Sequence, residues 1–152
     1  MSETNFVNTD DDHIKKKILE IARKMNQKQL VIWAIGCVEH VLSNFEEKYP
    51  NDDRPRKAVK AARAWVDDAI SVGEARNAAL EAHSAAREAE DDVACAVARA
   101  AGHAAATAHV AKHAVHAANY AAKVDFNEII WQYEKLLDLK NKIVENKKQD
   151  KK

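Results

Sequence analysis

The chain has 152 residues, a length typical of one domain with a single hydrophobic core. Lys and Arg together number 24, as do Asp and Glu, so the formal net charge is zero. This balance disfavours nucleic acid as the main partner, because binding to a phosphate backbone depends on an excess of basic residues. Cys37 and Cys95 stand apart in apolar stretches, which indicates reduced core thiols and a cytoplasmic protein.

No stretch of the sequence predicts a membrane segment or an export signal. The longest apolar run covers residues 30–38, whereas a bilayer-spanning helix needs about 20 such residues. The acidic N-terminus lacks the basic and apolar regions of a secretory signal. We therefore expect no membrane partner.

The residue composition predicts the fold class. Three Gly, two Pro and abundant Ala favour long helices joined by short loops. We predict an all-α fold, a compact bundle of about six or seven helices. We expect a disordered leader at 1–12, a single all-α domain at 13–146 and a disordered basic tail at 147–152.

Capping residues and apolar spacing predict the first four helices. The first helix follows the acidic triplet at 10–12, and the second covers residues 27–48. The third begins at Pro55, which suits a first helical turn, and runs to about residue 69. The fourth opens at the capping box formed by Ser71 and Glu74 and runs to about residue 89.

Residues 93–123 consist largely of alanine and predict a central, buried helix. Such a length is unusual for one straight helix, so we place a bend or break near residues 110–112, with one continuous helix as the alternative. A last helix follows residue 125, and its apolar stripe includes Tyr133.

A charged cluster surrounds the predicted start of the third helix. Asp53 precedes Arg54 and Arg56, and Arg63 follows two turns later. Planar guanidinium groups pair with carboxylates through two hydrogen bonds, so this cluster forms either a partner-binding corner or a structural helix cap.

Histidines form the second cluster. His103, His109, His113 and His116 lie within one alanine-rich stretch, and His83 lies on the apolar side of the preceding helix. On an unbroken helix His109, His113 and His116 would share a face and could bind a metal such as zinc. The favoured interpretation is structural or partner-contacting imidazoles with no metal and no cofactor; His83, His103 and His109 are the candidate contacts.

No recognisable catalytic motif is present. The sequence lacks a glycine-rich phosphate loop, a G-x-S-x-G elbow, an H-E-x-x-H zinc motif and a C-x-x-C pair. We therefore predict that the protein is not an enzyme.

Several segments resemble a family of bacterial putative immunity proteins, over about residues 33–123. They are Trp33-Ala34-Ile35-Gly36-Cys37-Val38-Glu39-His40, Asp53-Arg54-Pro55-Arg56, Glu74-Ala75-Arg76, Ala82-His83 and Gly102-His103-Ala104 with Thr107-Ala108-His109-Val110. The resemblance implies an all-α domain of a polymorphic toxin system, in which a cytoplasmic protein binds and blocks a cognate toxin. It implies no catalytic residues.

The sequence leaves two other hypotheses open. One is a metal-binding or enzymatic helical bundle that uses the histidines. The other is a homo-oligomeric scaffold, such as a homodimer that packs through alanine-rich faces with Trp131 and Tyr133. The identity of the toxin and the binding face are not encoded in any motif.

Overall fold

The structure, a computed structural model, describes residues 2–150, with side chains for 11–143 and 145. Within these residues it contains eight helices and no strand, which confirms an all-α fold. The helices are α1 (Ser2–Ala22), α2 (Gln27–Glu39), α3 (Ser43–Glu46), α4 (Arg54–Val66), α5 (Val72–Glu88), α6 (Asp92–Ala106), α7 (His113–Ala121) and α8 (Asn127–Asp150). The division of the chain into leader, domain and tail stays a prediction, and Met1, Lys151 and Lys152 lie outside the described residues.

The predicted number of six or seven helices is too low because the region 27–48 forms two helices. The chain tightens at His40–Leu42, where the amide of Val41 bonds the carbonyl of Val38 and that of Phe45 bonds Leu42. Hydrogen bonds across three residues wind the backbone more tightly than an α-helix. Val41 and Leu42, within this turn, and Phe45, which follows it, are all buried. No Gly or Pro marks the turn, so the sequence pattern does not reveal it.

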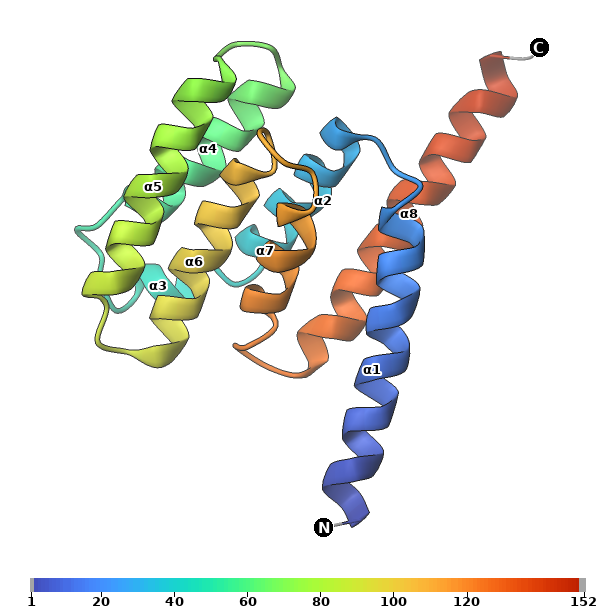
Figure 1. Cartoon of the computed structure of the whole chain (residues 1–152), viewed down its shortest axis with the longest axis horizontal. Helices are drawn as coiled ribbons and strands as arrows, with labels where there is room; N and C mark the ends of the chain where they lie inside the picture. Colours follow the sequence, from blue (N-terminus) through green and yellow to red (C-terminus); the bar gives the residue numbers. More distant parts are fainter. Residues whose placement is uncertain (1, 151–152) are drawn as a thin grey trace.

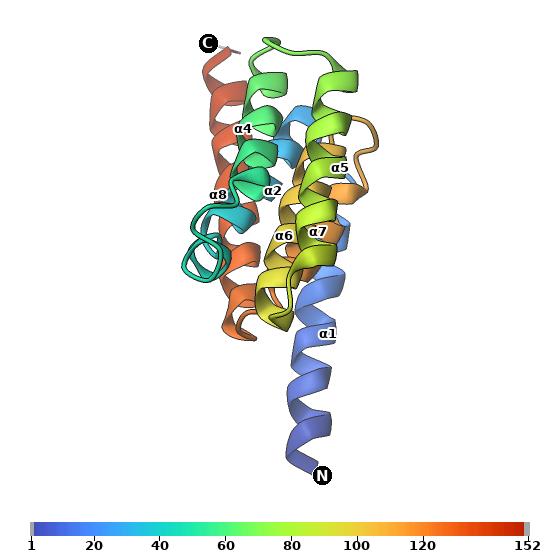
Figure 2. The ribbon, with the colours of Figure 1, turned by 90° about the vertical axis from the view of Figure 1, so that its left-hand side faces the viewer.

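The helices form two groups (Figure 1). The first, here called the body, contains α2 and α4 to α7, and the second is a lateral pair that consists of α1 and α8. α4, α5, α6 and α7 pack side by side with α2, whereas α1 packs mainly on α8. The view in Figure 2 shows α4 and α8 on the same side of the molecule. Gln132 attaches α8 to the body. Its buried side-chain amide donates to the backbone carbonyl of Ala118, and its backbone carbonyl accepts from the Trp33 indole.

α6 lies against α2, α3, α4, α5 and α7. Six of its alanines, Ala94, Ala98, Ala100, Ala101, Ala104 and Ala105, are completely buried. Small side chains let helix axes approach to the short end of the roughly 8–10 Å range. The alanine-rich composition therefore allows several helices to pack around α6.

A break separates α6 from α7 at residues 107–112, the region where the sequence predicts a bend or break. The hydroxyl of Thr107 donates to the carbonyl of His103. The side-chain amide of Gln27, from α2, donates to the carbonyls of Thr107 and Ala108 at 2.9 and 2.8 Å. These bonds satisfy carbonyl groups that a helix end leaves without partners.

The predicted capping box is present at the start of α5. The amide of Glu74 donates to the Ser71 hydroxyl at 3.1 Å, and the amide of Ser71 donates to the Glu74 carboxylate at 3.5 Å. Cys37 is buried and Cys95 is half-buried; both thiols are free. None of the helices in residues 2–150 combines the length and apolar character of a bilayer-spanning segment.

Candidate functional site

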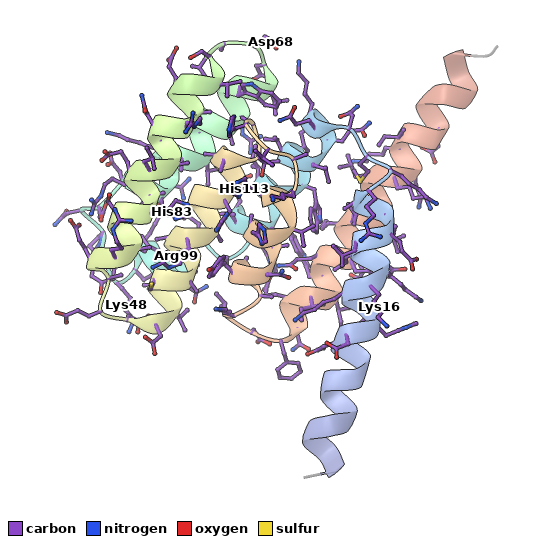
Figure 3. All side chains as sticks on the ribbon, in the orientation of Figure 1. Lys16, Lys48, Asp68, His83, Arg99 and His113 are labelled. Atoms are coloured by element: carbon purple, nitrogen blue, oxygen red, sulfur yellow. The ribbon has the colours of Figure 1, made fainter. Side chains whose placement is uncertain are left out.

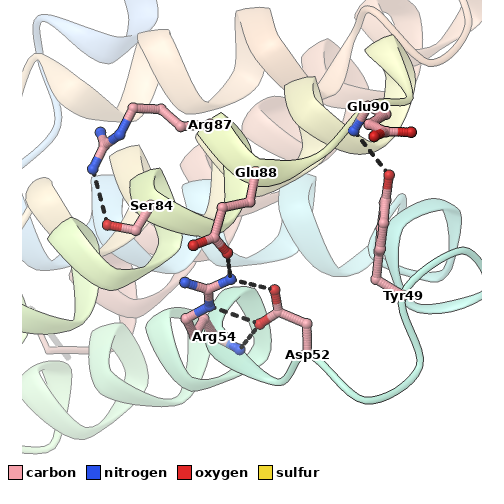
Figure 4. Close-up of polar contacts among 7 residues, drawn as sticks. All are labelled: Tyr49, Asp52, Arg54, Ser84, Arg87, Glu88 and Glu90. Atoms are coloured by element: carbon pink, nitrogen blue, oxygen red, sulfur yellow. Dashed lines mark hydrogen bonds and ion pairs between the residues drawn. The ribbon is translucent and has the colours of Figure 1, made fainter.

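Arg54 connects the start of α4 to the end of α5. Its guanidinium donates to both carboxylate oxygens of Asp52, at 2.9 and 2.7 Å, and also pairs with Glu88 (Figure 4). The hydrogen bonds from Arg54 hold the pKa of Asp52 below its usual range. The hydroxyl of Tyr49 accepts a hydrogen bond from the amide of Glu90 nearby, a contact that no sequence motif signals. The predicted charged corner thus joins two helices.

The carboxylate that bonds the first turn of α4 comes from Asp52 and not from Asp53. Asp53 occupies the N-cap position, but its side chain makes no capping hydrogen bond and pairs only with Lys57, at 3.4 Å. Asp52 accepts from the amide of Arg54 instead. A carboxylate two residues ahead of an amide reaches it in a tight turn, and the guanidinium of Arg54 holds Asp52 in that place.

Arg56 and Arg63 also have partners inside the chain. Arg56 donates to both oxygens of Glu46 on α3, at 2.6 and 2.5 Å. Arg63 donates to Glu39 on α2 at 2.6 Å. Exposed ion pairs contribute little to stability. They nevertheless direct the guanidinium groups of Arg56 and Arg63 toward Glu46 and Glu39 of neighbouring helices. Their role in partner binding stays a prediction.

Four histidines from three helices form the histidine cluster: His83 on α5, His103 on α6, and His113 and His116 on α7. The Nδ1 atoms of His103 and His113 lie 2.9 Å apart, so one ring donates a hydrogen bond to the other. The ring centroids of His83 and His116 lie 5.0 and 5.4 Å from that of His103. Tyr120 stacks on His103 at 5.3 Å. His103 is therefore the centre of the cluster.

Helical spacing and one glycine create the cluster. His113, His116 and Tyr120 are three and four residues apart and share one face of α7. Figure 3 shows His83, Arg99 and His113 on the same side of the body, from α5, α6 and α7. A methyl group at Gly102 would lie 2.7 Å from the His83 ring. Gly102 thus provides the space in which His83 approaches α6.

The cluster favours uncharged imidazoles. Burial, together with nearby His83 and His113, lowers the pKa of His103 to about 4. Burial is also the main cause of the lowered pKa of His83, with contributions from Arg99 and Arg87. The pKa of His113 is lowered in the same way by burial and by His116. Near neutral pH the rings of His83, His103 and His113 therefore act as hydrogen-bonding groups and not as cations.

The alternative metal set His109, His113 and His116 is not assembled. His109 is exposed and lies in the break at 107–112, outside α7. Within the described side chains, no group of three His, Cys, Asp or Glu has the arrangement of a metal site. The sequence could not reveal that His83 and His103 join His113 and His116, because these contacts depend on how three helices pack.

A second exposed surface lies along α2 and overlaps the first segment that resembles the immunity family. Ile32 is 45% exposed, and a side chain at Gly36 would meet open space. Both residues line two adjoining hollows, one against α4 and one against α8. His40, one turn further, stacks on Trp131 at 3.8 Å and bonds Glu128 at 2.8 Å. The spacing of 32, 36 and 40 places these residues on one side of the helix.

Comparison with known proteins identifies the family. No curated protein and no solved structure matches the chain. The family model described as "Imm-5 like putative immunity protein" matches residues 20–139. This match contains the region 33–123, on which the sequence resemblance rests, together with most of α8. The chain belongs to the Imm-5 like putative immunity protein family.

Proposed function

We propose that this protein is a cytoplasmic immunity protein of a polymorphic toxin system, which binds a cognate bacterial toxin and neutralises it by occlusion. The observation that carries the proposal is the family match over residues 20–139, which extends from the end of α1 well into α8. The role thus concerns the helical body as a whole, and the partner is a protein.

The environment of the polar side chains supports a binding role without catalysis. The thiol of Cys37 is buried, and burial raises its pKa, so it is a poor nucleophile. The rings of the histidine cluster are oriented by one another and not by a carboxylate, which is the usual partner of a catalytic or metal-bound imidazole. The ion pairs of Arg54, Arg56 and Arg63 join neighbouring elements and favour a stiff binding surface.

Co-expression with the product of a neighbouring gene tests the proposed function. We expect the chain to restore growth of cells that produce the toxin and to co-purify with it. In vitro, toxin activity should fall in proportion to added protein and reach zero at about one equivalent, because occlusion is stoichiometric. Inactivation of many toxin molecules by one molecule of this chain would contradict occlusion, and absence of binding to every adjacent toxin candidate would contradict the immunity role.

A homodimer is the second candidate because some large apolar side chains are exposed. Phe126 is 64% exposed, and Ile130, one helical turn later, is 45% exposed. Self-association through α8 would cover both residues. Light scattering at two protein concentrations distinguishes a dimer from a monomer, and a constant monomer mass would exclude this candidate.

A further inference from the structure

The histidine cluster belongs to a larger surface that is rich in basic groups, here called the histidine face. On α5, Arg76, Leu80, His83 and Arg87 are three or four residues apart and share one face. α6 contributes Arg99 and His103, residues 107–112 contribute His109 and Lys112, and α7 contributes His113, His116 and Tyr120. Lys123 lies over the Tyr120 ring, 4.8 Å from its centroid. Every titratable group in this set is basic or phenolic.

The carboxylates of α5 lie on another face of that helix, and those described in the neighbouring helices form no ion pair with the histidine face. Glu74, Glu81 and Glu88 repeat every seven residues and occupy another face of α5, where Glu88 pairs with Arg54. Asp92, in the first turn of α6, lies two turns before Arg99 on the same side of the helix but makes no ion pair with it. Among the described side chains, no carboxylate forms an ion pair with Arg76, Arg87 or Arg99 or with the histidine cluster. A chain of zero net charge therefore concentrates unpaired basic groups on one face.

Hydrogen-bonding capacity on this face is also unused. Nδ1 of His83 is buried and has no hydrogen-bond partner. The guanidinium of Arg87 donates only to a neutral group, the hydroxyl of Ser84, at 2.9 Å (Figure 4). Leu80, in the same row of α5, is 61% exposed. Unused hydrogen-bonding groups beside an exposed apolar side chain are features of a surface that a protein partner covers.

We propose that the histidine face binds an acidic segment of the toxin, whose Asp or Glu carboxylates pair with Arg87, Arg99 and the histidine cluster while an apolar side chain contacts Leu80. This inference rests on the proposed function and specifies its binding face. Charge complementarity identifies the partner: a face with basic groups and no paired carboxylate matches an acidic surface.

Binding of a carboxylate reverses the electrostatic environment of the imidazoles. In the free protein burial and nearby positive groups lower the pKa values of His83, His103 and His113. A bound carboxylate favours the protonated ring and raises these values, so binding takes up protons. The affinity should therefore increase as the pH falls from about 8 to about 6, because a ring whose pKa in the complex lies in this range takes up a proton on binding.

A peptide titration tests the face without the toxin. We would add hexaglutamate to the full chain and record the NMR signals of the histidine rings, with hexaglutamine as the uncharged control. The expected result is a saturable shift for His83, His103 and His113 that is larger at about pH 6 than at about pH 8, and that is lost in Arg99→Gln. Equal shifts with hexaglutamine, no shift at all, or stronger binding of inorganic phosphate or an RNA duplex would overturn the inference.

Titration with the toxin identified by rescue tests the face in the complex. Arg99→Gln and His103→Gln should each weaken binding about tenfold or more, and His103→Gln should reduce its pH dependence. Lys60→Gln removes the same charge from the exposed side of α4 and should leave binding unchanged. Thermal melting verifies that the variants fold.

The two proposals fail in different ways. If the toxin binds Arg99→Gln and His103→Gln as tightly as the unmodified chain, the proposed binding face is wrong while the immunity role stands. Loss of binding in Ile32→Asp alone would then place the contact on α2. If hexaglutamate binds this face but no toxin candidate binds the chain, the immunity role is wrong.

Discussion

At the scale of single residues, Gly102 determines whether His83 can reach the histidine cluster. A Cβ atom at this position would approach Cε1 and Nε2 of His83 to 2.7 Å, well inside van der Waals contact. Glycine is unfavourable within a helix by about 1 kcal/mol relative to alanine. The close approach of the His83 ring is therefore a physical reason for glycine at residue 102 despite this cost.

A double-mutant cycle measures this coupling. We expect Gly102→Ala to stabilise the His83→Ala variant by about 1 kcal/mol, and to be neutral or destabilising in the unmodified chain, where the ring must move. Urea denaturation measures both differences. Gly36→Ala is the control, because a side chain at residue 36 meets open space, and it should stabilise both backgrounds equally. Equal effects of Gly102→Ala in the two backgrounds would contradict the role of Gly102.

His103 makes stability depend on pH. Its pKa is about 4 in the folded protein, compared with about 6.5 in an unfolded chain. The unfolded chain therefore binds the proton first, and the free energy of unfolding should fall as the pH decreases from about 6.5 to about 4. The pKa shift of His103 can lower the free energy of unfolding by at most about 3 kcal/mol. Partial solvent exposure of the ring reduces this loss to about 1 to 2 kcal/mol.

Urea denaturation at about pH 7 and about pH 4.5 tests this expectation. The stability of His103→Gln should fall less over this range than that of the unmodified chain, because glutamine does not titrate. Carboxylates titrate in both proteins, so the difference between the two curves isolates the imidazole. Parallel curves would show that His103 has an ordinary pKa.

Asp52 and Asp53 are adjacent but have different roles. Asp52 accepts hydrogen bonds from the amide and the guanidinium of Arg54, whereas Asp53 is 66% exposed and pairs only with Lys57. We expect Asp52→Ala to lower the free energy of unfolding by about 1 to 2 kcal/mol and Asp53→Ala to change it by less than about 0.5 kcal/mol. Chemical denaturation compares the two, and a larger loss for Asp53→Ala would restore Asp53 as the cap.

At the scale of helices, the break between α6 and α7 depends on a side chain from α2. Gln27 donates to the carbonyls of Thr107 and Ala108. Gln27→Ala should lower stability by about 1 to 2 kcal/mol, because two carbonyl groups lose their donor. Gln27→Glu should lower it further near neutral pH, since a carboxylate has no donor and repels the carbonyl oxygens.

Hydrogen exchange locates this effect. Amides at 108–114 should exchange faster in Gln27→Ala than in the unmodified chain, while those in the middle of α5 should be unaffected. A uniform change along the chain would show that Gln27 acts on global stability alone.

At the scale of the whole molecule, the helices separate two kinds of surface. The acidic side of α5 is joined to α4 by the pair of Arg54 and Glu88, whereas its basic side faces the histidine cluster. Such an arrangement gives a neutral chain a local electrostatic preference for an acidic partner.

The histidine cluster should be independent of metal in the whole protein. We expect protein purified without a tag to contain less than about one tenth of an equivalent of zinc, nickel or copper, and to melt at the same temperature with and without a chelator. Elemental analysis and thermal melting measure the two quantities. A stoichiometric metal, or a lower melting temperature in chelator, would support the metal-binding alternative instead.

Much of the fold follows from local sequence. The capping box at Ser71 and the first-turn position of Pro55 depend on residues a few positions apart, so capping chemistry predicts them. The break after Ala106 is expected only from the length of the alanine-rich stretch. The turn at His40–Leu42 has no such signal, and this is why the helix count differs.

The sequence by itself determined an all-α chain with an alanine-rich, buried helix, and its motifs identified the immunity family. Only the tertiary structure decided which histidines meet and that Asp52 and not Asp53 holds Arg54. The physical reason is distance along the chain. Propensities and caps act within a helical turn, whereas contacts between His83, His103 and His113 exist only once three helices pack at a separation that alanine and glycine permit.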